Sequence, residues 1–114
     1  MRLPLPEVLA ESREDGTVEL KLRLSPSLEC FQGHFPGFPI LPGVVQIDWA
    51  VRFAARCFPR PGRFLAARNL RFLSIMGPDA EPTLRLSQQA GALQFSYSSG
   101  GKKCSSGTLL FEAP

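Results

Sequence analysis

The sequence predicts an α+β fold in which one buried helix packs against an antiparallel sheet. The stretch from Val44 to Phe58 is apolar on nearly every face, which is typical of a helix covered by other elements. Other stretches alternate apolar and polar residues between turn residues, as half-buried strands do. Two such strands precede the helix and the others follow it through short connections. This order predicts a sheet of about five to six strands wrapped around one long central helix.

The N-terminal part of the chain predicts a hairpin. After a loose arm, Glu7 to Ser12 can form a short strand that turns at Arg13-Glu14-Asp15-Gly16. Residues 17–24 then alternate cleanly between apolar and charged side chains. We therefore expect a half-buried strand from Thr17 to Leu24.

The central helix is expected to begin at Pro42 and Gly43, because a missing N–H does no harm in the first helical turn. Residues 59–62, Pro-Arg-Pro-Gly, end it. The helix is too short and too charged to cross a membrane. Its charged residues fall on one i, i+4 row, namely Asp48, Arg52 and Arg56.

The remainder of the chain predicts strands only. A long strand runs from Phe64 to about Ile75 and is followed by a turn at Gly77-Pro78-Asp79. Thr83 to Gln89 and Ala92 to Ser98 form a hairpin with one apolar face, and Lys102 to Glu112 forms the last strand. The apolar face of the hairpin consists of Leu84, Leu86, Leu93, Phe95 and Tyr97.

Length and composition indicate an ordinary globular protein. With 114 residues the chain predicts a single domain over residues 1–114. The three cysteines are odd in number and widely spaced, and no signal peptide or transmembrane segment is evident, which favours reduced thiols in a cytoplasmic protein. With one histidine and no cysteine pair, a zinc site is not expected.

The net charge of +3 has an uneven distribution along the chain. A basic patch would attract an acidic partner, whereas scattered surface arginines are the alternative interpretation. Nucleic acid is not expected as a partner, because no combined aromatic and basic platform accompanies the charge. The arginines concentrate in the helix and the segment after it: Arg52, Arg56, Arg60, Arg63, Arg68 and Arg71.

A stiff loop from His34 to Pro42 leads into the helix. Its prolines fix φ, remove N–H donors and push each preceding residue toward extended geometry. The residues expected to shape the loop are Phe35, Pro36, Gly37, Pro39 and Pro42. The loop therefore holds the only histidine of the chain in a fixed place.

His34 and Asp48 are the candidate catalytic residues. A neutral imidazole is the side chain best suited to proton transfer at neutral pH. A carboxyl group on an apolar helix is disfavoured as the ion, so Asp48 can act as an acid. The N–H groups of Gly43 and Val44 lie at the helix N-terminus, where they can polarise a carbonyl oxygen. These are the parts that β-elimination from a 3-hydroxyacyl thioester requires.

These residues resemble a known family. The stretch Gly33-His34-Phe35-Pro36-Gly37-x-Pro39-x-x-Pro42-Gly43-Val44 is similar to the active-site motif of the 3-hydroxyacyl-[acyl-carrier-protein] dehydratases of the FabA and FabZ kind. The acid of that family lies on the central helix at the place of Asp48. The continuation Gln46-Ile47-Asp48-Trp49-Ala50 is most similar to the ApeI-like dehydratases of aryl-polyene pathways.

The resemblance implies a hot-dog fold and a homodimer, with a higher oligomer or a heterodimer as alternatives. In that family the histidine of one subunit faces the acid of the other. The substrate is a thioester of acyl carrier protein or coenzyme A, and no metal or redox cofactor is needed. An acidic carrier protein would give a role to Arg56, Arg60, Arg63 and Arg68.

Other interpretations of the single residues stay open. His34 can be a structural histidine that bonds to loop backbone. Asp48 can form an ion pair with Arg52, which would stabilise its charged form. Cys30 and His34 can form a nucleophile pair, although a buried thiol is the ordinary case.

Two departures from the family pattern keep other functions open. The family usually has glutamine at the place of Arg52, and its longer members have an extra N-terminal segment that helps cover the site. The first alternative to a dehydratase is a hot-dog thioesterase, in which Asp48 activates water. The second is a non-catalytic member that binds acyl carrier protein or pairs with an active paralogue.

Overall fold

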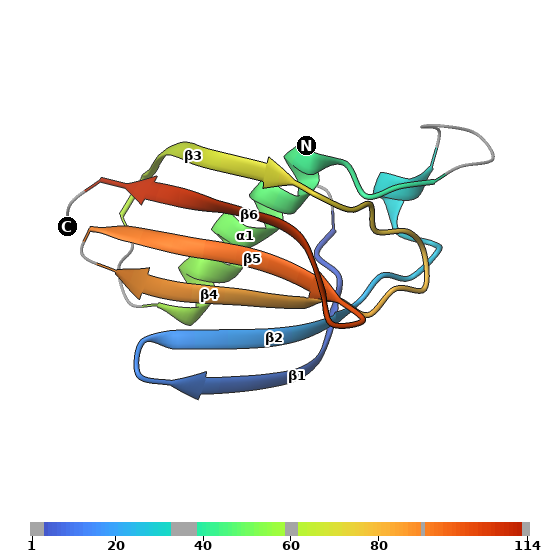
Figure 1. The fold of residues 1–114 in the computed structure, drawn as a ribbon, viewed down its shortest axis with the longest axis horizontal. Coiled ribbons are helices and arrows are strands. Elements are labelled where there is room, and N and C mark those ends of the chain that lie inside the picture. The colour runs from blue at the N-terminus through green and yellow to red at the C-terminus, as the bar shows by residue number, and fades with distance from the viewer. Residues whose placement is uncertain (1–3, 33–38, 59–61, 90, 113–114) are drawn as a thin grey trace.

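The structure is a computed structural model, and it describes residues 4–32, 39–58, 62–89 and 91–112. In this part of the chain six strands form one sheet, and a single α-helix, α1, packs on it (Figure 1). A short 3-10 helix, Glu29–Phe31, precedes α1. The elements are β1 (Glu7–Glu14), β2 (Thr17–Arg23), α1 (Gly43–Cys57), β3 (Phe64–Phe72), β4 (Thr83–Gln89), β5 (Ala92–Ser99) and β6 (Lys102–Phe111).

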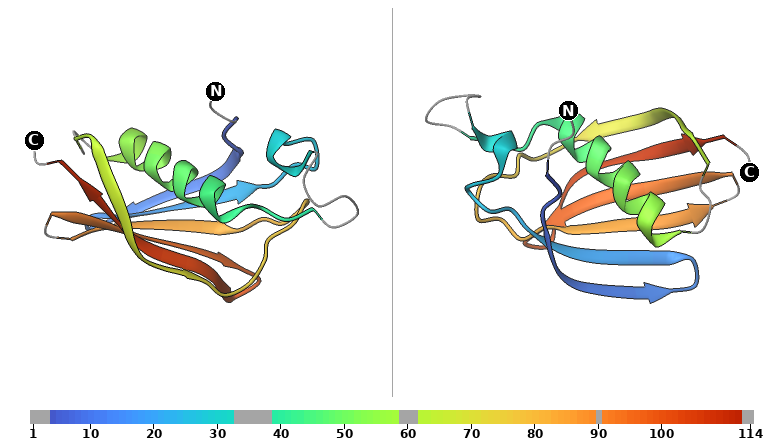
Figure 2. Two further views of the ribbon diagram at one scale, coloured as in Figure 1. Left: turned by 90° about the horizontal axis from the view of Figure 1, so that it is seen from above. Right: turned by 180° about the vertical axis from the view of Figure 1, so that it is seen from behind.

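The sheet is antiparallel throughout, in the order β1-β2-β4-β5-β6-β3. This order places β1 and β3 at the two edges. The sheet curves, and α1 crosses its concave face (Figure 2). The predicted α+β arrangement of a sheet about one helix is therefore confirmed.

The core lies between α1 and the inner face of the sheet. Leu84 pairs with Tyr97 and Leu86 pairs with Phe95 across the β4–β5 hairpin, and all four side chains are buried. Trp49 belongs to the same apolar cluster and is fully buried on the sheet-facing side of α1. The alternation of the hairpin thus gives the buried face that the sequence predicts.

The strand predicted to run to Ile75 ends at Phe72. The regular register with β6 ends at the pair Phe72–Ser105, and the amides of Leu73 and Ser74 then both donate to one carbonyl of β6, that of Cys104, at 2.8 and 3.1 Å. The chain then turns under the loop before α1, where the Leu41 amide donates to the Met76 carbonyl at 2.8 Å. The apolar run through residues 73–76 therefore lines the helix N-terminus instead of extending the strand.

Gly107 on β6 allows two apolar side chains to approach the backbone. A Cβ at this position would lie 2.7 Å from Leu70 Cδ2 and 2.7 Å from Phe95 Cε2. We expect Gly107→Ala to lower the free energy of unfolding by about 1–3 kcal/mol, because the buried ring must move. Urea denaturation tests this against Ser106→Ala, for which we expect a change below about 0.5 kcal/mol. Equal stability of the two variants would show that the ring moves aside without cost.

Candidate active site

The described residues include eight of the predicted site positions, three of which are the arginines Arg56, Arg63 and Arg68. Asp48, Gly43 and Val44 lie on α1, and Pro39 and Pro42 lie in the loop before it. The other predictions, His34, Phe35, Pro36, Gly37 and Arg60, lie outside the described residues.

The N-terminus of α1 presents two amides that form no hydrogen bond with the residues that the structure describes. The Val45 and Gln46 amides both donate to the Pro42 carbonyl, at 3.1 Å each. Among the described residues, neither the Gly43 nor the Val44 amide has a hydrogen-bond acceptor, and Pro42 at the N-cap provides no side-chain cap. The positive end of the helix dipole adds to these two donors. This first turn can therefore stabilise a carbonyl oxygen that gains negative charge.

A mostly apolar pocket of about 300 Å³ lies beside this helix end. It is lined by residues 40–42 of the loop, by Gly43 and Gln46 of α1 and by residues 72–75. Phe72 covers the helix N-terminus so closely that a Cβ on Gly43 would lie 2.9 Å from its ring. Only glycine fits at position 43 with the ring in this place, so Phe72 and Gly43 together shape the pocket.

Asp48 forms an ion pair within the helix. An Arg52 guanidinium nitrogen, Nη1, donates to Asp48 Oδ2 at 3.2 Å. The Asp48 side chain is 43% exposed and that of Arg52 only 17%, so the guanidinium is held against the protein. The i, i+4 pair considered from the sequence is thus present. It supplies a cation beside the carboxyl group that would have to give up a proton.

A buried network of hydrogen bonds connects the first turn of α1 to the preceding loop and to the sheet. Gln46 is 3% exposed, and its side-chain Nε2 donates to the Leu41 carbonyl at 3.1 Å. Its Oε1 accepts a 2.6 Å hydrogen bond from the Ser105 hydroxyl of β6. The Tyr97 hydroxyl of β5 donates to the Gln46 backbone carbonyl at 2.7 Å. The network therefore joins the loop, the helix and two strands.

The Tyr97 hydroxyl stays protonated as a donor in this network. Burial raises the pKa of Tyr97 well above its usual value, and the charge of Asp48 raises it further. Sequence reasoning missed the network. The available signal was Gln46, a polar side chain on the same helical face as Ala50 and Phe53, both of which are buried.

Cys30 lies in the short 3-10 helix and is buried. Burial raises the pKa of its thiol, which disfavours the thiolate that a nucleophile needs. Cys30 is thus in the environment of a structural thiol.

The arginines predicted to contact a carrier protein lie on separate elements. Arg56 is near the end of α1, with its guanidinium carbon 5.5 Å from the centre of the Phe53 ring. Arg63 precedes β3 and pairs with Glu112 at 3.4 Å. Arg68 lies on β3 opposite Thr108 of β6.

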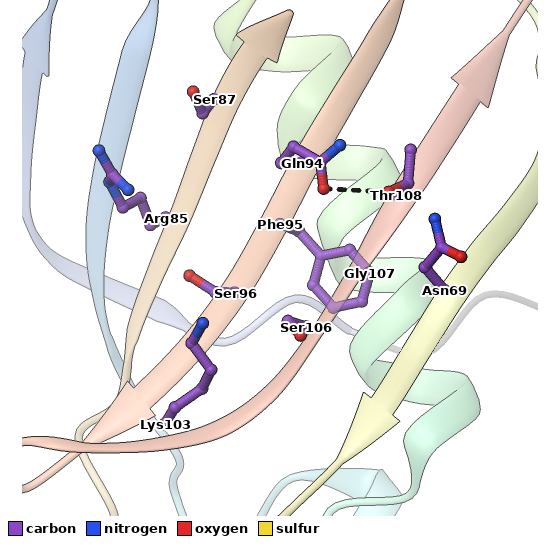
Figure 3. A pocket seen from close by; sticks show the side chains of 10 residues that line it. All are labelled: Asn69, Arg85, Ser87, Gln94, Phe95, Ser96, Lys103, Ser106, Gly107 and Thr108. Carbon is purple, nitrogen blue, oxygen red and sulfur yellow. Dashed lines mark hydrogen bonds between the residues drawn. The ribbon is translucent and has the colours of Figure 1, made fainter.

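A second hollow, of about 390 Å³, lies on the outer face of the sheet, away from α1 (Figure 3). Its lining is polar and includes Arg85, Gln94, Lys103 and Thr108. No residue predicted for catalysis lines it. The apolar pocket at the helix N-terminus is therefore the better candidate for the site.

No group of three or more His, Cys, Asp and Glu side chains in the described part of the chain could hold a metal ion. No helix of residues 4–32, 39–58, 62–89 or 91–112 is long and apolar enough to cross a membrane.

Comparison with protein families gives a match over most of the chain. The family model described as ApeI-like, ApeI dehydratase, matches residues 10–108. A stretch of 27 residues is 59% identical to the 3-hydroxyacyl-[acyl-carrier-protein] dehydratase FabZ of Erythrobacter litoralis. That stretch is 24% of this chain and 18% of the FabZ protein, so the chain aligns with less than a fifth of this relative.

Solved structures share the fold. A chain of the dehydratase heterocomplex ApeI:P from Xenorhabdus doucetiae is 27% identical, with a TM-score of 0.86 over 92% of this chain and 96% of that one. An uncharacterised protein from Erwinia carotovora subsp. atroseptica is 36% identical, with a TM-score of 0.82 over 94% of this chain and 95% of that one. The PpsC dehydratase domain from Mycobacterium tuberculosis is 15% identical, with a TM-score of 0.72 over 96% of this chain and 45% of that one. These matches confirm the predicted hot-dog fold.

Proposed function

The chain belongs to the ApeI-like dehydratase family, and we propose that it removes water from 3-hydroxyacyl thioesters to give trans-2-enoyl thioesters. The observation that carries the proposal is the first turn of α1. Two amides without an acceptor among the described residues lie there beside an apolar pocket, on the helix that also holds Asp48. A thioester carbonyl at these amides would place the acyl chain among apolar side chains.

Each proposed residue has one role in the elimination. His34 takes the proton from C2 of the substrate, and the electron pair of that C–H bond moves toward the thioester carbonyl. The Gly43 and Val44 amides stabilise the negative charge on the carbonyl oxygen. Asp48 gives a proton to the hydroxyl group on C3 as the C3–O bond breaks. Water leaves, a double bond forms between C2 and C3, and the proton passes from His34 to Asp48 before the next turnover.

The substrate is proposed to arrive on acyl carrier protein or coenzyme A, in a pathway of fatty-acid-like or aryl-polyene synthesis. The support is the similarity to a FabZ stretch and to the ApeI:P heterocomplex. Arg56, Arg60, Arg63 and Arg68 remain the proposed contacts for an acidic carrier protein.

We propose that the chain functions as a dimer, in which a second chain binds at the β3 edge of the sheet. β3 is an edge strand, so the main-chain groups on its open side have no partner among the described residues. Exposed apolar side chains accompany this edge, and we call them the edge surface: Val44, Leu65, Phe72, Leu73 and Ile75. Exposed apolar residues in such a group are typical of an interface between subunits. A second copy of the chain is the proposed occupant, and a paralogue is the alternative.

One observation favours a second candidate function. Arg52 holds a cation 3.2 Å from the proposed acid, and one similar chain belongs to a dehydratase heterocomplex, ApeI:P from Xenorhabdus doucetiae. The chain can therefore serve as a non-catalytic subunit of a heterodimer whose active residues lie on the partner.

Mass spectrometry of 3-hydroxyacyl thioesters incubated with the purified protein tests the proposal. Loss of water with the thioester intact is the expected result. Free acid and free thiol would instead show a thioesterase. No turnover of either carrier-bound or coenzyme A substrates would favour the non-catalytic subunit, and turnover that returns only with a paralogue would establish it.

We expect Arg52→Gln to raise kcat about two- to fivefold, because it frees the Asp48 carboxyl group from the 3.2 Å ion pair and an i, i+4 pair has only a modest energy. The pH dependence of kcat for this variant and the wild type measures the effect. Arg85→Gln, which removes the ion pair of Arg85 with Glu19 at 3.6 Å, away from α1, is the matched control and should leave kcat unchanged. A kcat that falls in Arg52→Gln would show that the ion pair holds the acid in its working position.

A further inference from the structure

We propose that Gln46 is a positioning residue that fixes the Gly43 and Val44 amides for the thioester carbonyl, an inference that rests on the proposed dehydratase function. Gln46 touches no reacting atom in the proposed mechanism. It acts through the loop and the helical turn that carry the two amides.

Gln46 is a polar residue in an apolar environment, and both the oxygen and the nitrogen of its side-chain amide are hydrogen-bonded. The residue is buried on the sheet-facing side of α1, where its neighbours along the face, Ala50 and Phe53, are apolar. A primary amide in such a place costs free energy unless its groups are paired. Here Oε1 accepts from Ser105 at 2.6 Å and Nε2 donates to Leu41 at 3.1 Å. An apolar side chain of the same size would fill this space without any of these requirements.

The hydrogen bond to the Leu41 carbonyl connects Gln46 to the loop before α1. The Leu41 carbonyl belongs to the peptide bond that enters Pro42, and the Pro42 carbonyl accepts the Val45 and Gln46 amides. On its other side Leu41 donates to the Met76 carbonyl. The peptide before the helix is therefore fixed from both sides, which leaves the Gly43 and Val44 amides one orientation.

Two residues of the sheet hold Gln46 in place by hydrogen bonds. Ser105 lies on β6 and Tyr97 on β5, and both are fully buried. Their hydroxyl groups bind the side-chain and main-chain oxygens of Gln46, so the helix cannot turn about its axis without breaking one of them. Gln46 also lines the pocket together with Gly43. A change at Gln46 is thus transmitted to the amides that face the substrate.

Two substitutions at Gln46 separate positioning from packing. Gln46→Leu keeps the volume and leaves the Leu41 carbonyl and the Ser105 hydroxyl unpaired. We expect it to lower kcat about 10- to 100-fold with little change in KM, since a small misplacement of catalytic groups has effects of this size. Gln94→Leu is the matched control, because Gln94 also accepts a hydrogen bond from a hydroxyl group, that of Thr108, but lies on the outer face of the sheet.

Gln46→Glu is expected to change the pH dependence of kcat in a way that a change in packing alone would not. When its carboxyl group is protonated, it can donate to the Leu41 carbonyl and accept from Ser105, as glutamine does. When ionised, it has no proton to donate. We expect kcat of this variant to be near the wild-type value at low pH and to fall more steeply than that of the wild type as the pH rises. Circular dichroism at each pH restricts the comparison to folded protein.

Backbone relaxation of Gly43 and Val44, measured by nitrogen-15 NMR, gives a readout that needs no turnover. Gln46→Leu should lower the order parameters of both amides, whereas Gln94→Leu should not. Wild-type kcat and unchanged order parameters in Gln46→Leu would overturn the proposal. If the wild type has no dehydratase activity but the order parameters fall, the proposed function fails while the positioning of the two amides stands. If neither is seen, both are wrong.

Discussion

Asp48→Asn is expected to lower the kcat for dehydration by about 10²- to 10⁴-fold, the range that removal of a general acid produces. The asparagine amide has the same shape and can still form hydrogen bonds, but it cannot give a proton to the departing hydroxyl group. His34→Ala should cause a loss of the same order, because it removes the base. Single-turnover assays with a 3-hydroxyacyl thioester, followed by mass spectrometry, measure both losses.

The stability of Asp48→Asn should change little. The side chain is part-exposed, and an ion pair of this kind contributes about 1 kcal/mol or less to stability. Asp15→Asn in the β1–β2 turn makes the same chemical change far along the chain and is the matched control. Full activity of Asp48→Asn would remove this residue from the mechanism.

Mixing the two inactive variants tests whether His34 and Asp48 meet across a subunit interface. If each site takes its base from one chain and its acid from the other, a mixed dimer has one intact site. Random exchange of subunits in an equal mixture should then restore about a quarter of the wild-type activity. If both residues of a site come from the same chain, the mixture stays inactive.

The sequence predicts the elements best where a local period decides the structure. The alternation in β4 and β5 places Leu84, Leu86, Phe95 and Tyr97 on one face, and the structure buries all of them. α1 is likewise predicted almost to the residue, because Pro42 and Gly43 begin it and its apolar stretch is continuous. These features depend on neighbours within a few residues, which is the information a single sequence carries.

The parts that the sequence does not predict depend on distant contacts. β3 ends at Phe72 because the Leu73 and Ser74 amides both bond to the carbonyl of Cys104. This residue lies on β6, which follows β4 and β5 in the sequence. The role of Gln46 depends on Ser105 and Tyr97, which no local pattern connects to it. Arg63 has a carboxylate partner, Glu112, that only the sheet topology brings near. In the same way the exposure of β3 becomes visible only once the strand order is known.

The exposed edge strand β3 leads to the second prediction with a large effect, the loss of the proposed dimer. Leu65 is 54% exposed on β3 and does not line the pocket, so its substitution probes the edge surface without changing the site directly. We expect Leu65→Glu to convert the proposed dimer to a single chain. Placing a carboxylate in an apolar interface costs about 3 kcal/mol or more, which weakens association about 100-fold. Light scattering coupled to size-exclusion chromatography measures the molar mass over a range of protein concentrations.

Activity should be lost together with the dimer, by about 100-fold at concentrations where Leu65→Glu is a single chain, if the site needs groups from both copies. Leu9→Glu is the matched control, because Leu9 is 42% exposed on the opposite edge strand, β1. That edge carries charged side chains, including Glu7, Glu11 and Arg13, which discourage pairing with another strand. Leu9→Glu should therefore keep both the mass and the turnover of the wild type. A Leu65→Glu variant that is monomeric and fully active would show that one chain holds a complete site, whereas one that stays dimeric would place the interface away from β3.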